Sequence, residues 1–378
     1  MIGRHAVTSA IGLGVVLRVG VACWNGLDGP SFGATADAAN FHRFAIAVSE
    51  GQWAPGAGLT GFSYAYTLGL LYRVTGPSLL LGSLLSCLAW LTSALTVRAS
   101  LRHLHVAEPA QFATLLIYAL LPSSVLWTAV TLREPYELLS VNLTLYAVLL
   151  LLDRRSVAAW LLLLGSVLLG ALLHGALLVV GALVIGGLIL REAARMFATP
   201  WARAVAVGAI MMAVVFGGGY AFRSMYAKYN FTGGPAAAME RHLRTGMLQP
   251  SRTVYISDPT VGSTAELAIA LPIALLQYLF EPMPWKMNRW IDLGFLAENV
   301  LRLVMIALAV ATALSNPQQG RLVWPLVVWY LAMETVWAVG TFNWGTAARH
   351  HLPATGLLLT AASVRWASGP LPLRSSRE

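Results

Sequence analysis

The sequence predicts an all-α polytopic membrane protein with about ten transmembrane helices and both termini in the cytoplasm. Hydrophobic residues make up 57% of the 378 residues, and charged residues only 11%. Tryptophan and tyrosine tend to fall at the ends of apolar runs, where aromatic side chains anchor helices at the membrane surface. We expect residues 1–378 to form a single transmembrane domain with no separate soluble domain.

The formal net charge of +9 does not indicate a nucleic-acid partner. Nucleic-acid binding needs a basic patch on a folded polar surface, whereas these arginines follow the ends of apolar runs. Cys23 and Cys87 lie inside apolar runs, which argues against a disulfide framework and a cysteine-based metal site. The abundance of Ala, Gly, Leu and Arg is typical of a GC-rich bacterial genome. We therefore expect a multi-pass protein of the bacterial cytoplasmic (inner) membrane, with the lipid bilayer as its surroundings.

A transmembrane helix needs about 20 predominantly apolar residues. Residues 61–75 and 266–280 are too short and too interrupted, so we expect them to lie on the outer face as juxtamembrane helices. Residues 156–190 hold two short spans divided at His174-Gly175. The other predicted spans are residues 6–24, 77–97, 109–128, 136–152, 204–222, 292–314, 322–340 and 350–367.

The positive-inside rule orients this arrangement. If neither juxtamembrane segment crosses, the arginines that flank the spans fall on one side of the membrane. If either segment crossed alone, that set would be divided between the two sides. The arginines expected in the cytoplasm are Arg4, Arg98, Arg102, Arg154, Arg155, Arg191, Arg195, Arg203, Arg321, Arg365, Arg374 and Arg377.

The long polar connections consequently fall on the outer face. They include a first outer loop at residues 25–60 and a long outer loop at residues 223–265. Binding and catalytic residues are concentrated on loops held by a rigid scaffold. We therefore expect the protein to act on the outer side of the membrane.

Charged residues at the outer edge of the apolar runs indicate an active site there. Asp37 follows the first run, and Arg133 with Glu134 separates two others. A charge this close to hydrocarbon costs a few kcal/mol unless it is paired or faces water. Each has a structural alternative: Asp37 can cap a helix that starts near Ala38, and Arg133 with Glu134 can form a simple juxtamembrane ion pair.

Further polar residues inside or beside the spans also have either a functional or a structural role. Arg349 and His350 stand at the outer end of the last span, where snorkelling is the structural alternative to a functional role. Within the membrane, Glu298 and Arg302 share one helix face and can pair, and Arg18 can join Glu298 across spans. We interpret those three as a structural network.

Several short motifs resemble, in order along the chain, those of the GT-C glycosyltransferases, which take sugars from polyprenyl-phosphate carriers. Residues 35–42, which contain Asp37 and His42, resemble the acidic motif of the first loop. Residues 62–76 resemble the juxtamembrane helix of the family. The remaining matches are residues 121–124 with 132–134, residues 280–285, and residues 343–350, the last two resembling bacterial members tied to surface polysaccharide.

The resemblance implies a polyprenyl-phosphate sugar donor and a glycan, lipid or protein acceptor. The chain has no glycine-rich strand-to-helix turn that would hold a nucleotide donor. Asp37 would take the proton from the acceptor hydroxyl. Glu134 would orient Arg133 or share a divalent Mg or Mn ion with Asp37. The candidates for holding phosphate or substrate are Arg133, Glu134, Arg349, His350, Arg289, His42 and Trp285.

Three functions remain open on the sequence. The first is a lipid-phosphosugar glycosyltransferase acting on the outer face. The second is a surface-polysaccharide polymerase or ligase that uses diphosphate-linked glycans and relies on arginine and histidine. The third is a lipid or solute transporter, which inverted repeats and midplane charges would indicate. We find no repeat, and most of the charge outside the cytoplasm lies at the outer edge, which favours the first two.

Overall fold

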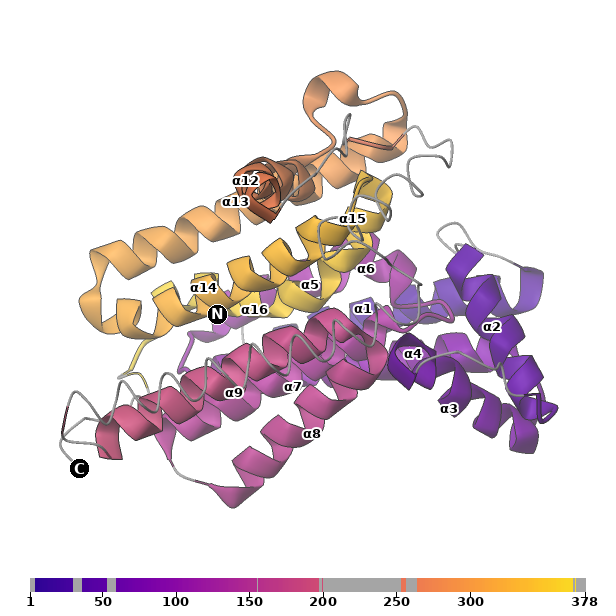
Figure 1. Ribbon diagram of the computed structural model, residues 1–378, viewed down its shortest axis with the longest axis horizontal. Helices are drawn as coiled ribbons and strands as arrows, with labels where there is room; N and C mark the ends of the chain where they lie inside the picture. Colours follow the sequence, from indigo (N-terminus) through magenta and orange to yellow (C-terminus); the bar gives the residue numbers. More distant parts are fainter. Residues whose placement is uncertain are drawn as a thin grey trace.

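The computed structural model describes residues 4–29, 36–52, 59–154, 156–196, 199, 253–255, 264–369 and 371. Every regular element in these residues is a helix, and the strand pairing in them is limited to isolated bridges (Figure 1). The predicted all-α class is therefore confirmed for this part of the chain. The predicted span 204–222 and nearly all of the long outer loop 223–265 lie outside the described residues.

Six helices of the described part are long and apolar enough to cross a membrane, which supports the prediction of a multi-pass membrane protein. The first, α1, continues through a short π-helical segment, Trp24–Asp28. The orientation of the termini and the larger number of spans stay predictions. The six helices are α1 (Arg4–Cys23), α4 (Leu79–His103), α7 (Glu134–Asp153), α9 (Gly175–Met196), α13 (Trp290–Ser315) and α14 (Pro317–Gly340).

Two predicted spans are each divided into shorter helices. Residues 109–128 form α5 (Glu108–Leu120) and α6 (Pro122–Trp127), because Pro122 has no N–H to continue the helix. Residues 350–367 form the end of α15 (Trp344–His350), α16 (Leu352–Ser363) and a 3₁₀ turn, Val364–Trp366. The predicted division at His174 is confirmed, since α8 (Val157–Leu173) ends immediately before it and α9 begins after it.

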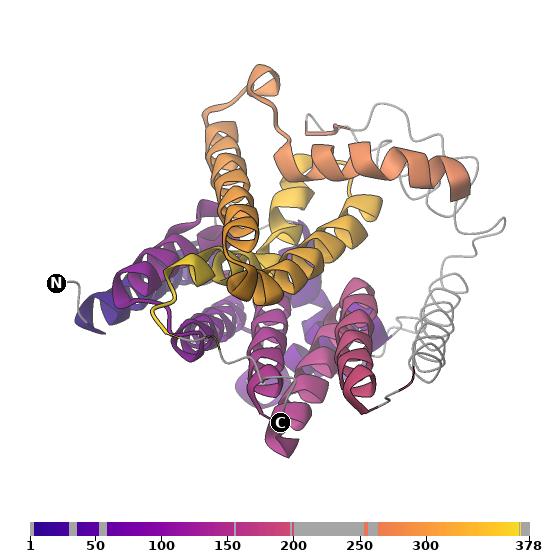
Figure 2. The ribbon, with the colours of Figure 1, turned by 90° about the vertical axis from the view of Figure 1, so that its left-hand side faces the viewer.

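The two short segments form helices of their own. Residues 61–75 lie in α3 (Leu59–Thr75), which packs on α2 (Ala36–Ser49) and α8. Residues 266–280 lie in α12 (Thr264–Phe280), which crosses the direction of α13 and α14 (Figure 2). Both helices therefore depart from the main bundle direction, and their position at the membrane surface stays a prediction.

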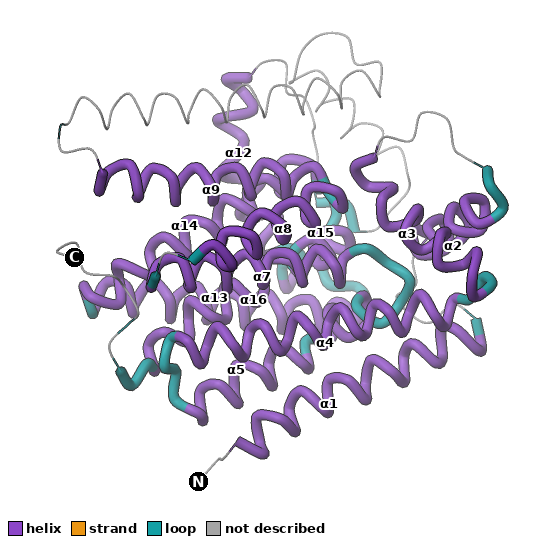
Figure 3. The backbone as a smooth tube through the Cα atoms, turned by 90° about the horizontal axis from the view of Figure 1, so that it is seen from below, coloured by secondary structure: helices purple, strands orange, loops and turns teal. Residues whose placement is uncertain are grey.

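The two ends of the bundle differ in character (Figure 3). At one end lie the links from α4 to α5, from α7 to α8 and from α13 to α14, together with described arginines such as Arg102, Arg154 and Arg321. At the other end lie α2, α3, the link from α6 to α7, the break at His174, and α15. The predicted outer loop residues and the predicted cytoplasmic arginines are thus separated along the bundle.

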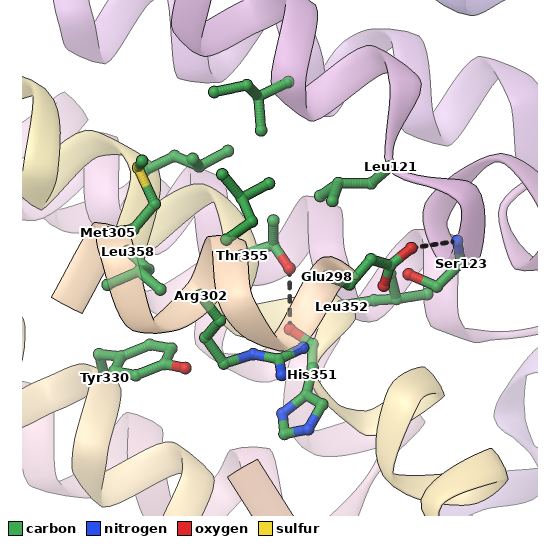
Figure 4. A pocket seen from close by; sticks show the side chains of 13 residues that line it. Leu121, Ser123, Glu298, Arg302, Met305, Tyr330, His351, Leu352, Thr355 and Leu358 are labelled. Carbon is green, nitrogen blue, oxygen red and sulfur yellow. Dashed lines mark hydrogen bonds between the residues drawn. The ribbon is translucent and has the colours of Figure 1, made fainter. Parts of the chain in front are cut away.

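Buried polar side chains hold α6 from two directions. Arg18 of α1 donates to the hydroxyl oxygens of Ser124 and Thr128 at 2.8 and 2.7 Å, and its guanidinium lies over the Trp90 ring. From the other side, a carboxylate oxygen of Glu298 accepts the backbone N–H of Ser123 at 2.7 Å (Figure 4). The expected bridge between Arg18 and Glu298 is therefore wrong, because each satisfies a different part of α6.

Arg302 also has other partners than the one expected. Its guanidinium donates to Asn299 Oδ1 at 2.6 Å and to the Leu279 carbonyl at 2.9 Å, which ties α13 to the end of α12. Figure 4 shows Arg302 beside Tyr330 and His351 in a small cavity that α13, α14 and α16 help to line. The intramembrane charges thus stabilise helix packing through hydrogen bonds to backbone and neutral groups.

The separation of the two ends gives a topology prediction. A reporter fused after Gly51, which follows α2, should read as extracytoplasmic. Reporters fused after His103 or Asn316, at the arginine-rich end, should read as cytoplasmic. Paired alkaline-phosphatase and green-fluorescent-protein fusions measure both states. A cytoplasmic signal from the Gly51 fusion would reverse the orientation of the site.

Candidate functional site

Asp37 lies at the start of α2 and binds an arginine from the far end of the chain. Its carboxylate accepts a hydrogen bond from Arg349 Nη1 at 2.7 Å, across 312 residues of sequence. The helix begins at Ala36, so Asp37 stands inside the first turn and the expected N-cap role is not the one it takes. About half of its side chain, 53%, remains exposed. An incoming molecule can therefore reach the carboxylate.

Glu134 is the buried partner of the same arginine. It opens α7, where Pro135 at the second position is compatible with a helix start. Only 2% of Glu134 is exposed, and its Oε1 accepts from both Arg349 Nε, at 3.0 Å, and Arg349 Nη2. Of the roles that the sequence left open for Glu134, pairing with its neighbour Arg133 is not the one seen: Glu134 orients Arg349.

Arg349 lies between these two carboxylates in α15. The Asn343 side chain caps this helix by accepting the N–H of Thr346 at 2.7 Å, which sets the position of the last turn. Burial alone would lower the pKa of Arg349, but the charges of Glu134 and Asp37 outweigh it and raise the pKa. The guanidinium is buried and permanently charged, so it does not snorkel at a span end as its structural alternative requires.

Arg133 pairs with an acid that the sequence analysis did not select. Its Nε lies 3.1 Å from Glu137 Oε1, one helical turn further along α7, and its Nη1 donates to the Leu173 carbonyl at 3.2 Å. The spacing of four residues between Arg133 and Glu137 was a signal available in the sequence. Arg133 also lies 5.8 Å from the Phe41 ring of α2. The guanidinium groups of Arg133 and Arg349 are thus each bound by a buried glutamate of the first turn of α7.

The carboxylates of this region fit an arginine better than a divalent cation. Asp37 and Glu134, the predicted metal ligands, both bind the Arg349 guanidinium. Among the residues that the structure describes, no group of three or more His, Cys, Asp or Glu side chains is arranged to hold a metal ion. We derive no step through Mg or Mn.

His350 belongs to a cluster of rings next to Arg349. Its Nδ1 lies 3.0 Å from the Thr341 hydroxyl, and its ring stacks on Trp337 with centroids 4.4 Å apart. His174, from the break between α8 and α9, packs on the same tryptophan at 4.2 Å. Trp337, Thr341 and His174 were not predicted as site residues. Their positions in sequence gave no common spacing that could have grouped them.

The following residue, His351, anchors the whole α15–α16 junction. Its Nδ1 lies 2.5 Å from the buried Glu334 carboxylate of α14, and its Nε2 lies 3.1 Å from the Tyr278 carbonyl of α12. A carbonyl can only accept, so Nε2 carries a proton. His351, at the N-cap position of α16, thus links three helices and stabilises the position of Arg349 and His350.

His42 binds Tyr72 of α3 and not the rings around His350. Tyr72 donates its hydroxyl proton to the Ser78 carbonyl at 2.8 Å, so His42 Nδ1–H donates to the Tyr72 oxygen at 2.9 Å. Burial lowers the pKa of His42, which keeps this ring neutral at pH 7. These bonds join α2 to α3 and to the start of α4. A substrate role for His42 stays a prediction.

Arg289 and Trp285 are not joined to the cluster by the contacts of the described residues. Arg289 is the N-cap residue before α13, and its backbone N–H donates to Asp292 Oδ2 at 3.1 Å. Trp285 lies in the 3₁₀ turn Pro284–Lys286 and is 78% exposed. Phosphate binding by Arg289 and substrate binding by Trp285 stay predictions.

An apolar groove of about 580 Å³ lies beside the site. It reaches the cluster at Leu173, whose carbonyl binds Arg133, and at Tyr136, two residues after Glu134. Most of its exposed lining is apolar side chain. It is formed mainly by α3 and α8, and its lining includes Tyr64, Leu68, Leu71, Tyr136, Leu169 and Leu173.

Comparisons with protein-family models, with curated proteins and with solved structures each find no match to this chain.

Removing the Arg349 guanidinium should destabilise the fold. Arg349→Ala leaves the Glu134 carboxylate buried without a countercharge, a change that costs about 3–5 kcal/mol in proteins. Arg349→Lys should lose less, because a point charge remains. Urea or SDS unfolding of the purified protein in mixed micelles measures the free energy.

Two further variants make this test specific. Arg43→Ala, at an exposed arginine of α2, should change stability by no more than about 0.5 kcal/mol. Adding Glu134→Gln to Arg349→Ala should recover much of the loss by removing the unpaired charge. Wild-type stability of Arg349→Ala would mean that the buried pair does not hold the site.

Proposed function

We propose that this protein transfers a sugar from a polyprenyl-phosphate-linked donor to a hydroxyl group of a glycan, lipid or protein acceptor on the extracytoplasmic face of the bacterial cytoplasmic membrane. The observation that supports it best is the half-exposed Asp37 carboxylate bound to a buried arginine that Glu134 holds in place. This arrangement offers a half-exposed carboxylate as the base and a guanidinium that can bind a phosphate.

In this mechanism the donor phosphate competes with Asp37 for Arg349. Glu134 occupies Nε and Nη2 of the guanidinium, whereas Nη1 binds the more exposed Asp37. A phosphate oxygen that takes the Nη1 hydrogen bond would free the Asp37 carboxylate next to the anomeric carbon. Arg133, whose side chain is partly exposed, supplies a second positive charge to the same anion.

The transfer step then balances without a cofactor. The acceptor oxygen forms a bond to the anomeric carbon while the bond from that carbon to the phosphate oxygen breaks. The acceptor proton passes to Asp37, and polyprenyl phosphate leaves with the electron pair, stabilised by Arg349 and Arg133. The apolar groove beside Arg133 suits the isoprenoid chain of the carrier, because its lining is mostly aliphatic and aromatic.

One observation favours the second candidate, a surface-polysaccharide polymerase or ligase. Two guanidinium groups lie in one region, and two arginines also match the larger charge of a diphosphate-linked glycan. The two candidates differ in the donor that they consume and agree on the leaving-group site.

Donor identity distinguishes the candidates. The full-length protein in nanodiscs is incubated with a panel of polyprenyl-phosphate monosaccharides and with a polyprenyl-diphosphate oligosaccharide, with octyl glucoside as acceptor. We expect release of polyprenyl phosphate and formation of the glycosylated acceptor from a member of the first group. Consumption of the diphosphate donor alone would favour the polymerase or ligase, and no consumption of either class would contradict both.

Asp37→Asn should abolish transfer and leave stability near the wild-type value. The asparagine keeps the shape of the side chain and still accepts from Arg349 Nη1, but it cannot take a proton at neutral pH. The expected loss is roughly a hundredfold or more in kcat. Glu50→Gln, at an exposed acid just after α2, is the matched control and should transfer normally. Full activity of Asp37→Asn would remove this residue from the mechanism.

A further inference from the structure

The ring cluster beside Arg349 carries two histidines whose protonation the hydrogen bonds assign. Trp337 contacts both, and the His174 and His350 ring centroids lie 6.3 Å apart. Neither ring is fully buried. Partial burial and the positive charges of Arg349 and Arg133 lower the pKa of His350 and favour the neutral ring.

His350 presents an acceptor at its outer nitrogen. The Thr341 hydroxyl donates its single proton to the Trp337 carbonyl at 2.8 Å, and a carbonyl cannot donate in return. The 3.0 Å contact between Thr341 and His350 Nδ1 must therefore be a donation from Nδ1–H. In the neutral ring, the proton on Nδ1 leaves Nε2 with a lone pair.

His174 presents a donor at its outer nitrogen. The backbone N–H of Ala176 donates to His174 Nδ1 at 3.1 Å, which requires a lone pair on Nδ1. The proton of the neutral ring is then on Nε2. No bond among the described residues uses Nε2 of either histidine. Toward the described residues, the two rings thus offer one donor and one acceptor that make no hydrogen bond, on rings whose centroids lie 6.3 Å apart.

This pair of atoms matches a hydroxyl group, which both donates and accepts one hydrogen bond. It does not match a phosphate, which only accepts. We propose that His174 Nε2–H and His350 Nε2 together bind one sugar hydroxyl of a substrate, an inference that rests on the proposed sugar transfer. The 6.3 Å between the ring centroids is compatible with one oxygen at about 2.9 Å from each Nε2. His350 is thereby reassigned from phosphate binding to sugar recognition.

Asparagine variants separate this role from the structural one. His350→Asn keeps a donor to Thr341, and His174→Asn keeps an acceptor for the Ala176 N–H, a position where asparagine caps a helix well. Each variant removes Nε2 together with the ring that packs on Trp337. The free energy of unfolding is therefore measured for each variant in parallel, and His350→Gln, which also lacks the ring, is the control for lost packing.

Steady-state kinetics with the active donor and octyl glucoside test the proposal. Each variant should raise KM roughly three- to tenfold for one substrate, and both should raise it for the same one. A raised donor KM assigns the hydroxyl to the transferred sugar, and a raised acceptor KM assigns it to the acceptor. The double variant should be little worse than either single variant, since both nitrogen atoms bind one group.

A deoxy substrate identifies the hydroxyl and completes the test. The analogue that lacks the bound hydroxyl should have the same KM for the wild type and for both variants. His350→Gln, which can place an amide oxygen near the position of Nε2, should recover part of the affinity. Wild-type KM values for both asparagine variants, or effects on different substrates, would overturn the proposal while leaving sugar transfer intact.

A binding measurement covers the case in which the proposed transfer fails. If the wild type consumes no donor, equilibrium binding of radiolabelled octyl glucoside and of radiolabelled polyprenyl-phosphate monosaccharides to the protein in nanodiscs is compared between the wild type and His350→Asn. Weaker binding of either ligand by the variant would support the hydroxyl site without sugar transfer. Equal binding of both ligands would overturn it.

Discussion

The buried pair of Glu134 and Arg349 is the interaction on which the site depends. It joins the start of α7 to the end of α15, across 215 residues of sequence. Removing both charges from water costs several kcal/mol per ion, and only close, well-oriented hydrogen bonds offset that cost. The guanidinium meets this condition with two donors on one carboxylate oxygen and a third on Asp37. Asp37 is thereby brought to the site from a separate helix.

The C-terminal helices supply the rigid frame that this pair requires. Asn343 caps α15, and residues 253–255 pair with the link before it, where Tyr255 N donates to the Phe342 carbonyl at 3.0 Å. On the other side of Arg349, His351 joins α12 and α14 through Tyr278 and Glu334. The polar residues of this segment therefore have successive roles along the chain. Asn343 caps α15, Arg349 binds the two carboxylates, His350 packs on Trp337, and His351 links α12 and α14.

Several properties could be derived from the sequence alone because they depend on local composition. The apolar runs predict a helical membrane protein, and the described part contains six helices that fit. His174 before a glycine predicts the break between α8 and α9, since that pair interrupts an otherwise continuous apolar run. The positions next to apolar runs identified four charged residues of the site, because charge beside hydrocarbon needs a partner or water. They are Asp37, Arg133, Glu134 and Arg349.

The choice of partners was decided only by the tertiary structure. Arg133 and Glu134 are adjacent in the sequence and carry opposite charges, but neighbouring side chains in a helix point in different directions. Arg133 therefore pairs with Glu137, one turn further along α7, and Glu134 pairs with Arg349 in α15. Burial of Arg349, which a position at a span end does not reveal, follows from the packing of α15 on α6 and α12. The hydrogen bonds that fix the protons of His174 and His350 come from nearby residues, Ala176 and Thr341. The two rings meet only because both pack on Trp337, so no sequence pattern could have grouped them. The sequence by itself determined the membrane class and which residues carry charge at its edge, and the tertiary structure decided which of those charges meet.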